Sequence, residues 1–208
     1  PGMIVLGLDG LDASDKDRRA GWERLAADLT ETCYKMYTMS PSGLSGEHIR
    51  LGAEDQWRMS GGYHLRPEAV EAFFYMYRHT GDDKYRDWAW HVFESIEEHC
   101  RTSSGGYAIV KNARARAPRQ GDVMHSFVIA ETFKYLFLIF GDDKSELPLS
   151  KWVFNTEAHP LLITPSLGRS HLRQLSASVA DGICKEGSAG AGAVSDAEQC
   201  AAGQITSA

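Results

Sequence analysis

Four charged side chains lie inside or beside apolar stretches of the sequence, where a charge is costly unless it has a task. They are Arg66, Glu68, Glu131 and Glu157. The clearest case is Glu131, which stands in the middle of the apolar run 124–140. A helix that is apolar all round is normally buried, and a buried carboxylate needs an ionic, hydrogen-bonding or metal partner. We therefore expect a polar cavity inside a shell of helices.

The segment around Arg66 is the first of three places where chemistry could occur. Glu68 and Glu71 lie three residues apart, so both face the same side of the first turn of a helix. Acidic residues also favour helix N-termini because of the helix dipole, and this ordinary explanation is the more common one. The aromatic residues that follow place the helix in a core, where Arg66 could bind an anionic or hydroxyl-rich ligand or pair with a carboxylate.

The second place is Glu131, which has Phe127 four residues before it and thus on the same helix face. An aromatic ring beside a carboxylate suits a sugar, which presents C–H surface and hydroxyl groups together. A structural carboxylate held by Arg66 or by backbone donors explains Glu131 equally well, and an ordinary core position explains Phe127.

The third place is the segment Asn155-Thr-Glu-Ala-His-Pro160, which gathers an amide, a hydroxyl, a carboxylate and an imidazole. Such oxygen ligands suit a hard cation such as Ca²⁺, and Thr156 could offer both its hydroxyl and its carbonyl oxygen. A capping turn is the ordinary alternative, and no HExxH pattern indicates zinc. Several carboxylates without a nucleophilic serine or cysteine motif favour acid/base hydrolysis. Inverting glycosidases of that kind place two carboxyl groups about 6.5–9.5 Å apart.

Helical periodicity accounts for most of the patterned sequence. Pro67 at a first helical position and Gly81 at a stop bound one helix. The alternation of amphipathic and more fully apolar helices predicts an all-α fold with two concentric helical layers. Helices are expected at residues 19–39, 66–80, 85–96 and 124–140, a long loop at 41–63 and a short extended segment at 105–110.

The 208 residues carry a net charge of −6, which argues against nucleic acid as the main partner. The basic stretch Lys111–Arg119 contains no aromatic residue and is interpreted as a solvated loop. Charged residues interrupt the longest apolar run, so it does not predict a membrane span. The four cysteines show no CxxC spacing, which disfavours structural zinc. We expect a domain over residues 1–165 and a disordered tail, rich in Gly, Ala and Ser, over residues 166–208.

In their order and spacing, these segments resemble the class I α-1,2-mannosidases, glycoside hydrolase family 47, and most of all the endoplasmic-reticulum type. The stretch Val153-Phe-Asn-Thr-Glu-Ala-His-Pro160 is the most specific. The other matching stretches are Glu31–Tyr34, His64–Glu71, Tyr77–Arg86, Gly105–Tyr107, Ser126–Phe127 and Ala130–Leu136.

The resemblance implies the C-terminal part of an (α/α)7 barrel that holds one calcium ion. By position, Thr156 corresponds to the calcium ligand, and Glu71 and Glu157 to residues that hold calcium-bound waters. Glu68 corresponds to the general base that activates water. The contacts to the mannose at the cleavage subsite correspond to Arg66, Phe127 and Glu131.

The implied activity is calcium-dependent, inverting removal of terminal α-1,2-linked mannose from high-mannose N-glycans, in the lumen of the endoplasmic reticulum or Golgi. A membrane anchor is expected only in a preceding region. Two alternatives stay open. One is a lectin-like relative in glycoprotein quality control. Cys33 and the stretch 153–160 argue against it, because they resemble the hydrolytic branch of the family. The other is an inactive, truncated remnant.

The sequence also departs from the family pattern. The general acid and a further catalytic aspartate belong to an upstream half without a counterpart here, so this chain alone is expected to be unstable or inactive. Cys33 corresponds to a cysteine whose disulfide partner would lie just before Pro1. His125 replaces a residue that is usually acidic, and Val128 replaces a larger one.

Overall fold

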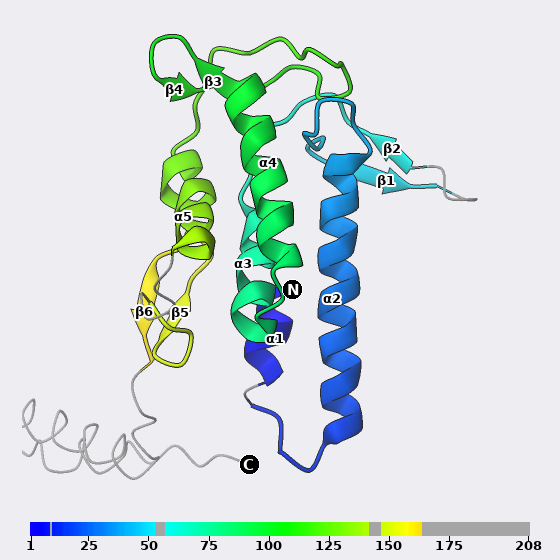
Figure 1. Ribbon diagram of the computed structural model, residues 1–208, viewed down its shortest axis with the longest axis vertical. Coiled ribbons are helices and arrows are strands. Elements are labelled where there is room, and N and C mark those ends of the chain that lie inside the picture. Colours follow the sequence, from blue (N-terminus) through cyan, green and yellow to red (C-terminus); the bar gives the residue numbers. More distant parts are fainter. Residues whose placement is uncertain (9, 53–56, 142–146, 164–208) are drawn as a thin grey trace, which may run out of the picture. The chain divides into compact units, whose positions relative to one another are not determined.

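Helices carry most of the fold in the described part of the chain, and short antiparallel strand pairs connect or flank them (Figure 1). The computed structural model describes residues 1–8, 10–52, 57–141 and 147–163, and Pro1–Leu162 forms one compact unit. In chain order the elements are α1 (Gly2–Leu8), α2 (Lys16–Thr38), β1 (Ile49–Leu51), β2 (Trp57–Met59), α3 (Glu68–Thr80), α4 (Lys84–Cys100), β3 (Arg101–Thr102), β4 (Gly106–Tyr107), the π-helix η2 (Val128–Phe133), α5 (Lys134–Phe140), β5 (Trp152–Phe154) and β6 (Pro160–Leu162).

Helix α3 lies at the centre of this unit because most of its faces are apolar. Its buried residues include Val70, Phe73 and Phe74, and it packs against α1, α2, α4 and α5. Gly81 ends the helix in the left-handed conformation, with φ 71°, and its N–H bonds to the carbonyl of Tyr77. The predicted start and stop of this helix are confirmed, and neighbours on several sides fix its first turn.

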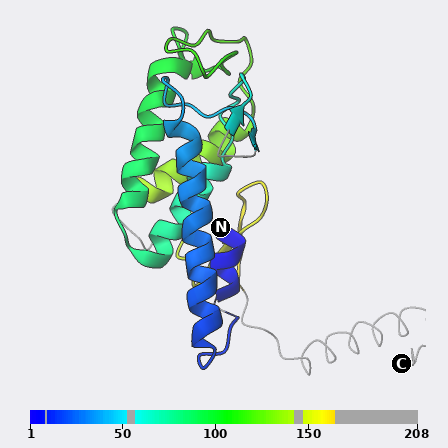
Figure 2. The same cartoon turned by 90° about the vertical axis from the view of Figure 1, so that its right-hand side faces the viewer.

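The helices form two layers, as the sequence predicted. Helices α2 and α4 are the outer ones, and Figure 2 shows α4 and the β5–β6 hairpin on opposite sides of the molecule. The hairpin docks on the inner helices through Phe154, whose ring centroid lies 5.7 Å from those of Phe74 and Tyr135. Packing between large aromatic rings of this kind fixes the hairpin against α3 and α5.

The loop predicted at residues 41–63 contains a hairpin, so that prediction is wrong in part. Strands β1 and β2 pair antiparallel, with Ile49 opposite Met59 and Arg50 opposite Arg58. Each strand has only three residues, which is too few for alternating apolar and polar side chains to stand out in the sequence. The extended segment expected at 105–110 is confirmed by β4 and by bridges that Val110 makes to two neighbouring segments.

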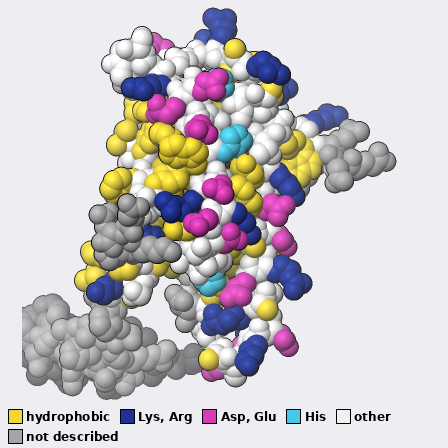
Figure 3. All heavy atoms as spheres, viewed as in Figure 1, with side chains coloured by type: hydrophobic (Ala, Val, Ile, Leu, Met, Phe, Trp, Pro, Cys, Tyr) yellow, Lys and Arg dark blue, Asp and Glu magenta, His cyan; other side chains and the backbone are white. Residues whose placement is uncertain are grey.

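Of the helix predicted at 124–140, residues 128–140 are helical, and this helix is not buried on every side. Ile129 is 59% exposed and Phe137 is 65% exposed, whereas Glu131 is 8% exposed. The first half of the helix is the π-helix η2, and only the second half is α-helical. A π-helix widens the turn and changes which residues share a face. The helix therefore buries one side in the core and leaves an apolar side open next to α4, where yellow side chains gather in Figure 3.

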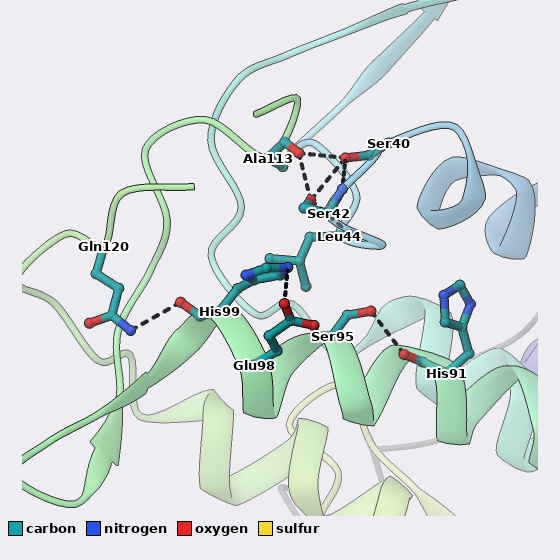
Figure 4. A network of polar contacts seen from close by, with 9 residues as sticks. All are labelled: Ser40, Ser42, Leu44, His91, Ser95, Glu98, His99, Ala113 and Gln120. Carbon is teal, nitrogen blue, oxygen red and sulfur yellow. Dashed lines mark hydrogen bonds and ion pairs between the residues drawn. The ribbon is translucent and has the colours of Figure 1, made fainter. Parts of the chain in front are cut away.

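The segment after α2 is anchored tightly, which matters because it leads to the candidate site (Figure 4). The hydroxyls of Ser40 and Ser42 both donate to the carbonyl of Ala113. Gly43 has φ 69°, and a Cβ atom there would lie 2.3 Å from Oγ of Ser95 on α4. Only glycine allows this close approach and this backbone conformation together.

No helix among the described residues has both the length and the apolar character needed to cross a membrane. The tail predicted to be disordered, with Cys184 and Cys200, lies outside the described residues.

Candidate active site

The first turn of α3, which carries Glu68 and Glu71, is held by an unusual backbone conformation just before it. Leu65 has φ 61° although it is not glycine, a strained conformation for a bulky residue. Its carbonyl accepts a 2.6 Å hydrogen bond from the buried hydroxyl of Thr132 on η2. This bond fixes the direction in which the chain enters α3, so it also fixes Arg66 and Glu68.

Glu131 lies in the π-helix, one residue before Thr132. It is buried, as the sequence predicted. The π-helix itself was not predicted, because its widened turn leaves no residue pattern that distinguishes it from an α-helix. Single π-helical turns inside helices often mark functional sites, and this one brings a buried carboxylate next to the start of α3.

The turn between β5 and β6 presents Thr156 and Glu157. The side-chain oxygen of Asn155 accepts hydrogen bonds from the backbone N–H groups of Glu157 (3.0 Å) and His159 (2.9 Å). Ala158 is buried and has φ 55°, and its carbonyl accepts a 2.8 Å hydrogen bond from Nζ of Lys134 at the start of α5. The turn is thus built by its own side chains and tied to the helix that carries Glu131.

The acidic side chains of these three elements act on two buried or half-buried carboxylates, Glu71 and Glu131. Burial raises the pKa of Glu71, and the charges of Glu68 and Glu131 add to this effect, while the amino group of Pro1 opposes it. Burial likewise raises the pKa of Glu131, followed by the charges of Glu157 and Glu68, while Lys134 and His159 lower it. Like charges held together in this way favour either bound protons or a bound cation.

Glu47 also belongs to this site, although no pattern in the sequence predicted it. Its Oε2 accepts a 2.6 Å hydrogen bond from Nε of Arg66, and its Oε1 accepts a 2.8 Å bond from the backbone N–H of His64. Nδ1 of His64 lies 3.4 Å from Oε2 of the same carboxylate. The carboxylate that Arg66 binds is therefore Glu47. The alternative in which Arg66 satisfies Glu131 is not supported.

A pocket lies beside the first turn of α3. Its lining includes Glu47, Tyr63, Arg66 and Glu68. Glu68 is exposed there, unlike Glu131. A carboxylate at the edge of an open pocket can reach water and ligand. Glu131 is not part of the lining of this pocket.

Phe127 lies close to Arg66, so the structure brings these two predicted residues together. Cζ of Arg66 is 5.6 Å from the centroid of the Phe127 ring, a distance typical of a cation–π contact. The ring of His125 stacks on Phe127 at 4.9 Å between centroids and 14° between planes. A second imidazole, that of His64, lies 5.4 Å from His125.

A calcium site needs several oxygen ligands around the ion. Among the described residues, no three His, Cys, Asp or Glu side chains are placed to hold a metal ion directly. Thr156, however, offers two oxygen atoms, and the next residue, Glu157, acts electrostatically on Glu131. This donor set fits a hard cation that is bound in part through water.

Cys33 is half-buried and lies in the lining of the same pocket. Neither Cys33 nor Cys100, which is buried in the core, has a disulfide partner among the described residues. Burial raises the pKa of the Cys33 thiol. The disulfide implied by the resemblance stays a prediction.

Comparisons with known proteins add independent information. The family model "Glycosyl hydrolase family 47" matches residues 1–163. The chain is 45% identical to the human endoplasmic reticulum mannosyl-oligosaccharide 1,2-alpha-mannosidase, over 80% of this chain and 24% of the human protein. It is also 45% identical to the mannosyl-oligosaccharide alpha-1,2-mannosidase IA of Spodoptera frugiperda, over 78% of this chain and 24% of that protein.

The structure resembles the alpha-1,2-mannosidase from Trichoderma reesei with a TM-score of 0.66 and 30% sequence identity, over 78% of this chain and 37% of that one. This likeness confirms the predicted all-α fold class. The chain spans about a quarter of the length of the curated relatives it matches.

Proposed function

Because the chain belongs to glycosyl hydrolase family 47, we propose that it forms part of an α-1,2-mannosidase. The reaction is hydrolysis of terminal α-1,2-linked mannose from high-mannose N-glycans, with inversion and with calcium. The observation that supports this most is the convergence of Glu68, Glu71, Glu131 and Glu157 from three separate elements. Like charges held close together favour a bound cation or bound protons, so this arrangement fits a metal-assisted acid/base site better than the helix dipole alone does.

Glu68 is the general base in this proposal. It lies at the first position of α3 and lines an open pocket, where a water molecule can approach it. It takes a proton from that water as the water attacks the anomeric carbon. Inversion also needs a carboxylic acid on the other side of the bond. The resemblance assigns that acid to a part of the family domain outside the matched segment.

The sugar is held by Arg66, Phe127 and Glu131. The guanidinium of Arg66, fixed by Glu47, donates to hydroxyl groups. The half-buried ring of Phe127 covers the C–H surface of the sugar. Glu131 accepts hydrogen bonds from hydroxyls, and its burial makes each of these bonds stronger than it would be in water.

Thr156 would bind calcium through its hydroxyl and its carbonyl oxygen, with Glu71 and Glu157 holding waters around the ion. When bound, the cation supplies positive charge that orients sugar hydroxyls and water. The chain's own contribution is to hold the hairpin turn in place, through Asn155 within the turn and Lys134 from α5.

We propose that this protein acts in the lumen of the endoplasmic reticulum or Golgi, and the name of the human relative, an endoplasmic reticulum enzyme, supports this. The partners would be high-mannose N-glycans on glycoproteins.

A chimera tests the proposal. Residues 1–163 replace the matching segment of the human endoplasmic reticulum enzyme, and release of mannose from a high-mannose glycan is measured. The chimera should hydrolyse the glycan, and Glu68→Gln should lower turnover by about 10²–10⁴-fold while glycan binding persists. The matched control is Glu94→Gln, an exposed glutamate on α4, which should have no effect. Undiminished turnover in Glu68→Gln would remove Glu68 as the base.

A further inference from the structure

Six exposed cationic side chains lie on two segments near the candidate site. We call this surface the basic rim, and it consists of Arg50, Arg58, Lys111, Arg114, Arg116 and Arg119. Within the described ranges, none of the six takes part in an ion pair. The whole chain carries a net charge of −6, so this concentration of positive charge runs against the overall balance.

Two members of the basic rim face each other in an unfavourable way. Arg50 on β1 is directly opposite Arg58 on β2 in the antiparallel pair. Residues that are directly opposite project to the same face, and like charges in this position destabilise the pair. An anionic group bound between them would remove that repulsion.

The loop that carries four members of the basic rim is bonded through its backbone to the segment that leads to the candidate active-site pocket. The N–H of Ala113 donates a 2.6 Å hydrogen bond to the carbonyl of Gly61. Tyr63 and Val110 exchange two hydrogen bonds of 3.0 Å, and Tyr63 lines the pocket together with Glu68. A ligand whose end enters the pocket would therefore extend its remaining part toward the basic rim.

We propose that the basic rim binds an acidic segment of the polypeptide that carries the glycan. This inference rests on the proposed function, which supplies the glycan end in the pocket. The positive charges are distributed along a loop and a hairpin, which fits an extended chain of carboxylates. In the loop part of the basic rim, the segment 111–119 contains no large apolar side chain that could insert into a lipid surface, and no aromatic ring on which a base could stack. In the hairpin part, Ile49, Trp57 and Met59 flank the two arginines but are partly buried.

The first experiment uses this chain and measures fluorescence anisotropy with a labelled peptide rich in Asp and Glu, and with its Asn/Gln counterpart. The chain should bind the acidic peptide and not the neutral one, and added salt should weaken binding. The variant with Arg114→Ala, Arg116→Ala and Arg119→Ala should lose at least about tenfold in affinity, because several weak exposed ion pairs are removed together.

The matched control replaces Lys16, Arg24 and Lys151 by Ala, which removes the same charge from exposed positions elsewhere. It should bind the acidic peptide as the unchanged chain does. The proposal would be overturned if the control lost as much affinity as the basic-rim variant, or if the neutral peptide bound as tightly as the acidic one. It would also be overturned if the chain bound phosphatidylserine vesicles more tightly than the acidic peptide. Circular dichroism verifies that both variants keep their helices.

The second experiment separates this proposal from the proposed function. In the chimera, the basic-rim variant should hydrolyse free high-mannose glycan unchanged, but its KM for a glycopeptide with acidic residues near the glycan should rise at least about threefold. If the chimera is active but shows no preference for the acidic glycopeptide, the role of the basic rim is overturned and the proposed function stands. A chimera without hydrolysis, while the isolated chain still binds acidic peptide, overturns the proposed function and leaves the anion-binding surface established.

Discussion

Nε of Arg66 donates a 2.6 Å hydrogen bond to Oε2 of Glu47, a residue that comes 19 positions earlier in the chain. The same carboxylate accepts a bond from the backbone N–H of His64. Glu47 is only 17% exposed at its side chain, whereas Arg66 is 48% exposed. The buried partner thus fixes the exposed one, which leaves the remaining donors of the guanidinium free to face a ligand.

Replacing this carboxylate by an amide should weaken substrate binding. In the chimera, Glu47→Gln is expected to raise KM about tenfold and to change kcat less, because Arg66 keeps its charge but loses its fixed position. The free energy of unfolding should fall by about 1 kcal/mol or less, since the pair is partly exposed. The control Glu23→Gln removes the carboxylate near His79 and should leave KM as it was. A change in kcat with constant KM would show that Glu47 acts in the chemical step instead.

The calcium proposal predicts that one threonine controls the response of stability to the ion. Calcium should raise the melting temperature of this chain, since a ligand at 100 times its Kd stabilises by about 2.7 kcal/mol. Thr156→Ala should abolish most of this increase, whereas Ser150→Ala, an exposed hydroxyl in the same region, should retain it. Differential scanning calorimetry with calcium and with chelator provides the measurement. An equal calcium response in Thr156→Ala would exclude this residue as a ligand.

Lys134 is expected to position the turn that carries Thr156. Its Nζ donates to the carbonyl of Ala158, and a hydrogen bond from a charged donor contributes about 1.5–3 kcal/mol. Lys134→Met should therefore lower stability by about 1–2 kcal/mol and weaken the calcium response. Hydrogen exchange should accelerate at the amides of residues 155–159. Lys151→Met, which changes an exposed lysine nearby, should have none of these effects. Unchanged hydrogen exchange in Lys134→Met would show that the turn keeps its structure without Lys134.

The converging carboxylates predict a specific dependence of stability on pH in the absence of divalent cations. Burial and neighbouring charges raise the pKa of Glu131 above its ordinary 4.5. Between that value and the raised one, the folded chain binds more protons than the unfolded chain, so the contribution of Glu131 to stability falls as pH rises. Glu131→Gln removes this contribution. The variant should gain stability relative to the unchanged chain as pH rises above 4.5, as measured by urea unfolding at several pH values. A constant difference across this range would contradict the argument.

The sequence predicted features that depend on neighbouring residues, and it did not predict features that depend on contacts between segments far apart in the chain. The start and stop of α3 depend on Pro67 and Gly81, which act locally, and both were predicted. The bond between Thr132 and the carbonyl of Leu65 and the pairing of Glu47 with Arg66 join distant segments. Neither leaves a local pattern. Glu47 stands in a segment without periodicity, so only its tertiary contacts reveal its place in the site.

The exposure of α5 had the same cause. An apolar residue at a helical position predicts burial, but the burial depends on a neighbour that the helix itself does not specify. Phe137 on α5 and Ile129 on the preceding η2 stay exposed, whereas Leu136 and Ile139 on α5 are buried.

The open side of α5 leads to a last prediction, which concerns this chain by itself. Trp90 on α4 is 49% exposed and Phe137 on α5 is 65% exposed, and both line an apolar groove with Phe93 and Phe140. Contiguous exposed apolar surface promotes association. The isolated chain should therefore self-associate with rising concentration and bind a hydrophobic dye. The double variant Trp90→Ser and Phe137→Ser should reduce both effects while lowering the free energy of unfolding by no more than about 1 kcal/mol, since neither ring is fully buried. Sedimentation velocity measures the association, and Leu161→Ser, at an exposed position on β6, serves as the control. If the double variant associates as the unchanged chain does, the groove is not the surface through which copies of the chain meet.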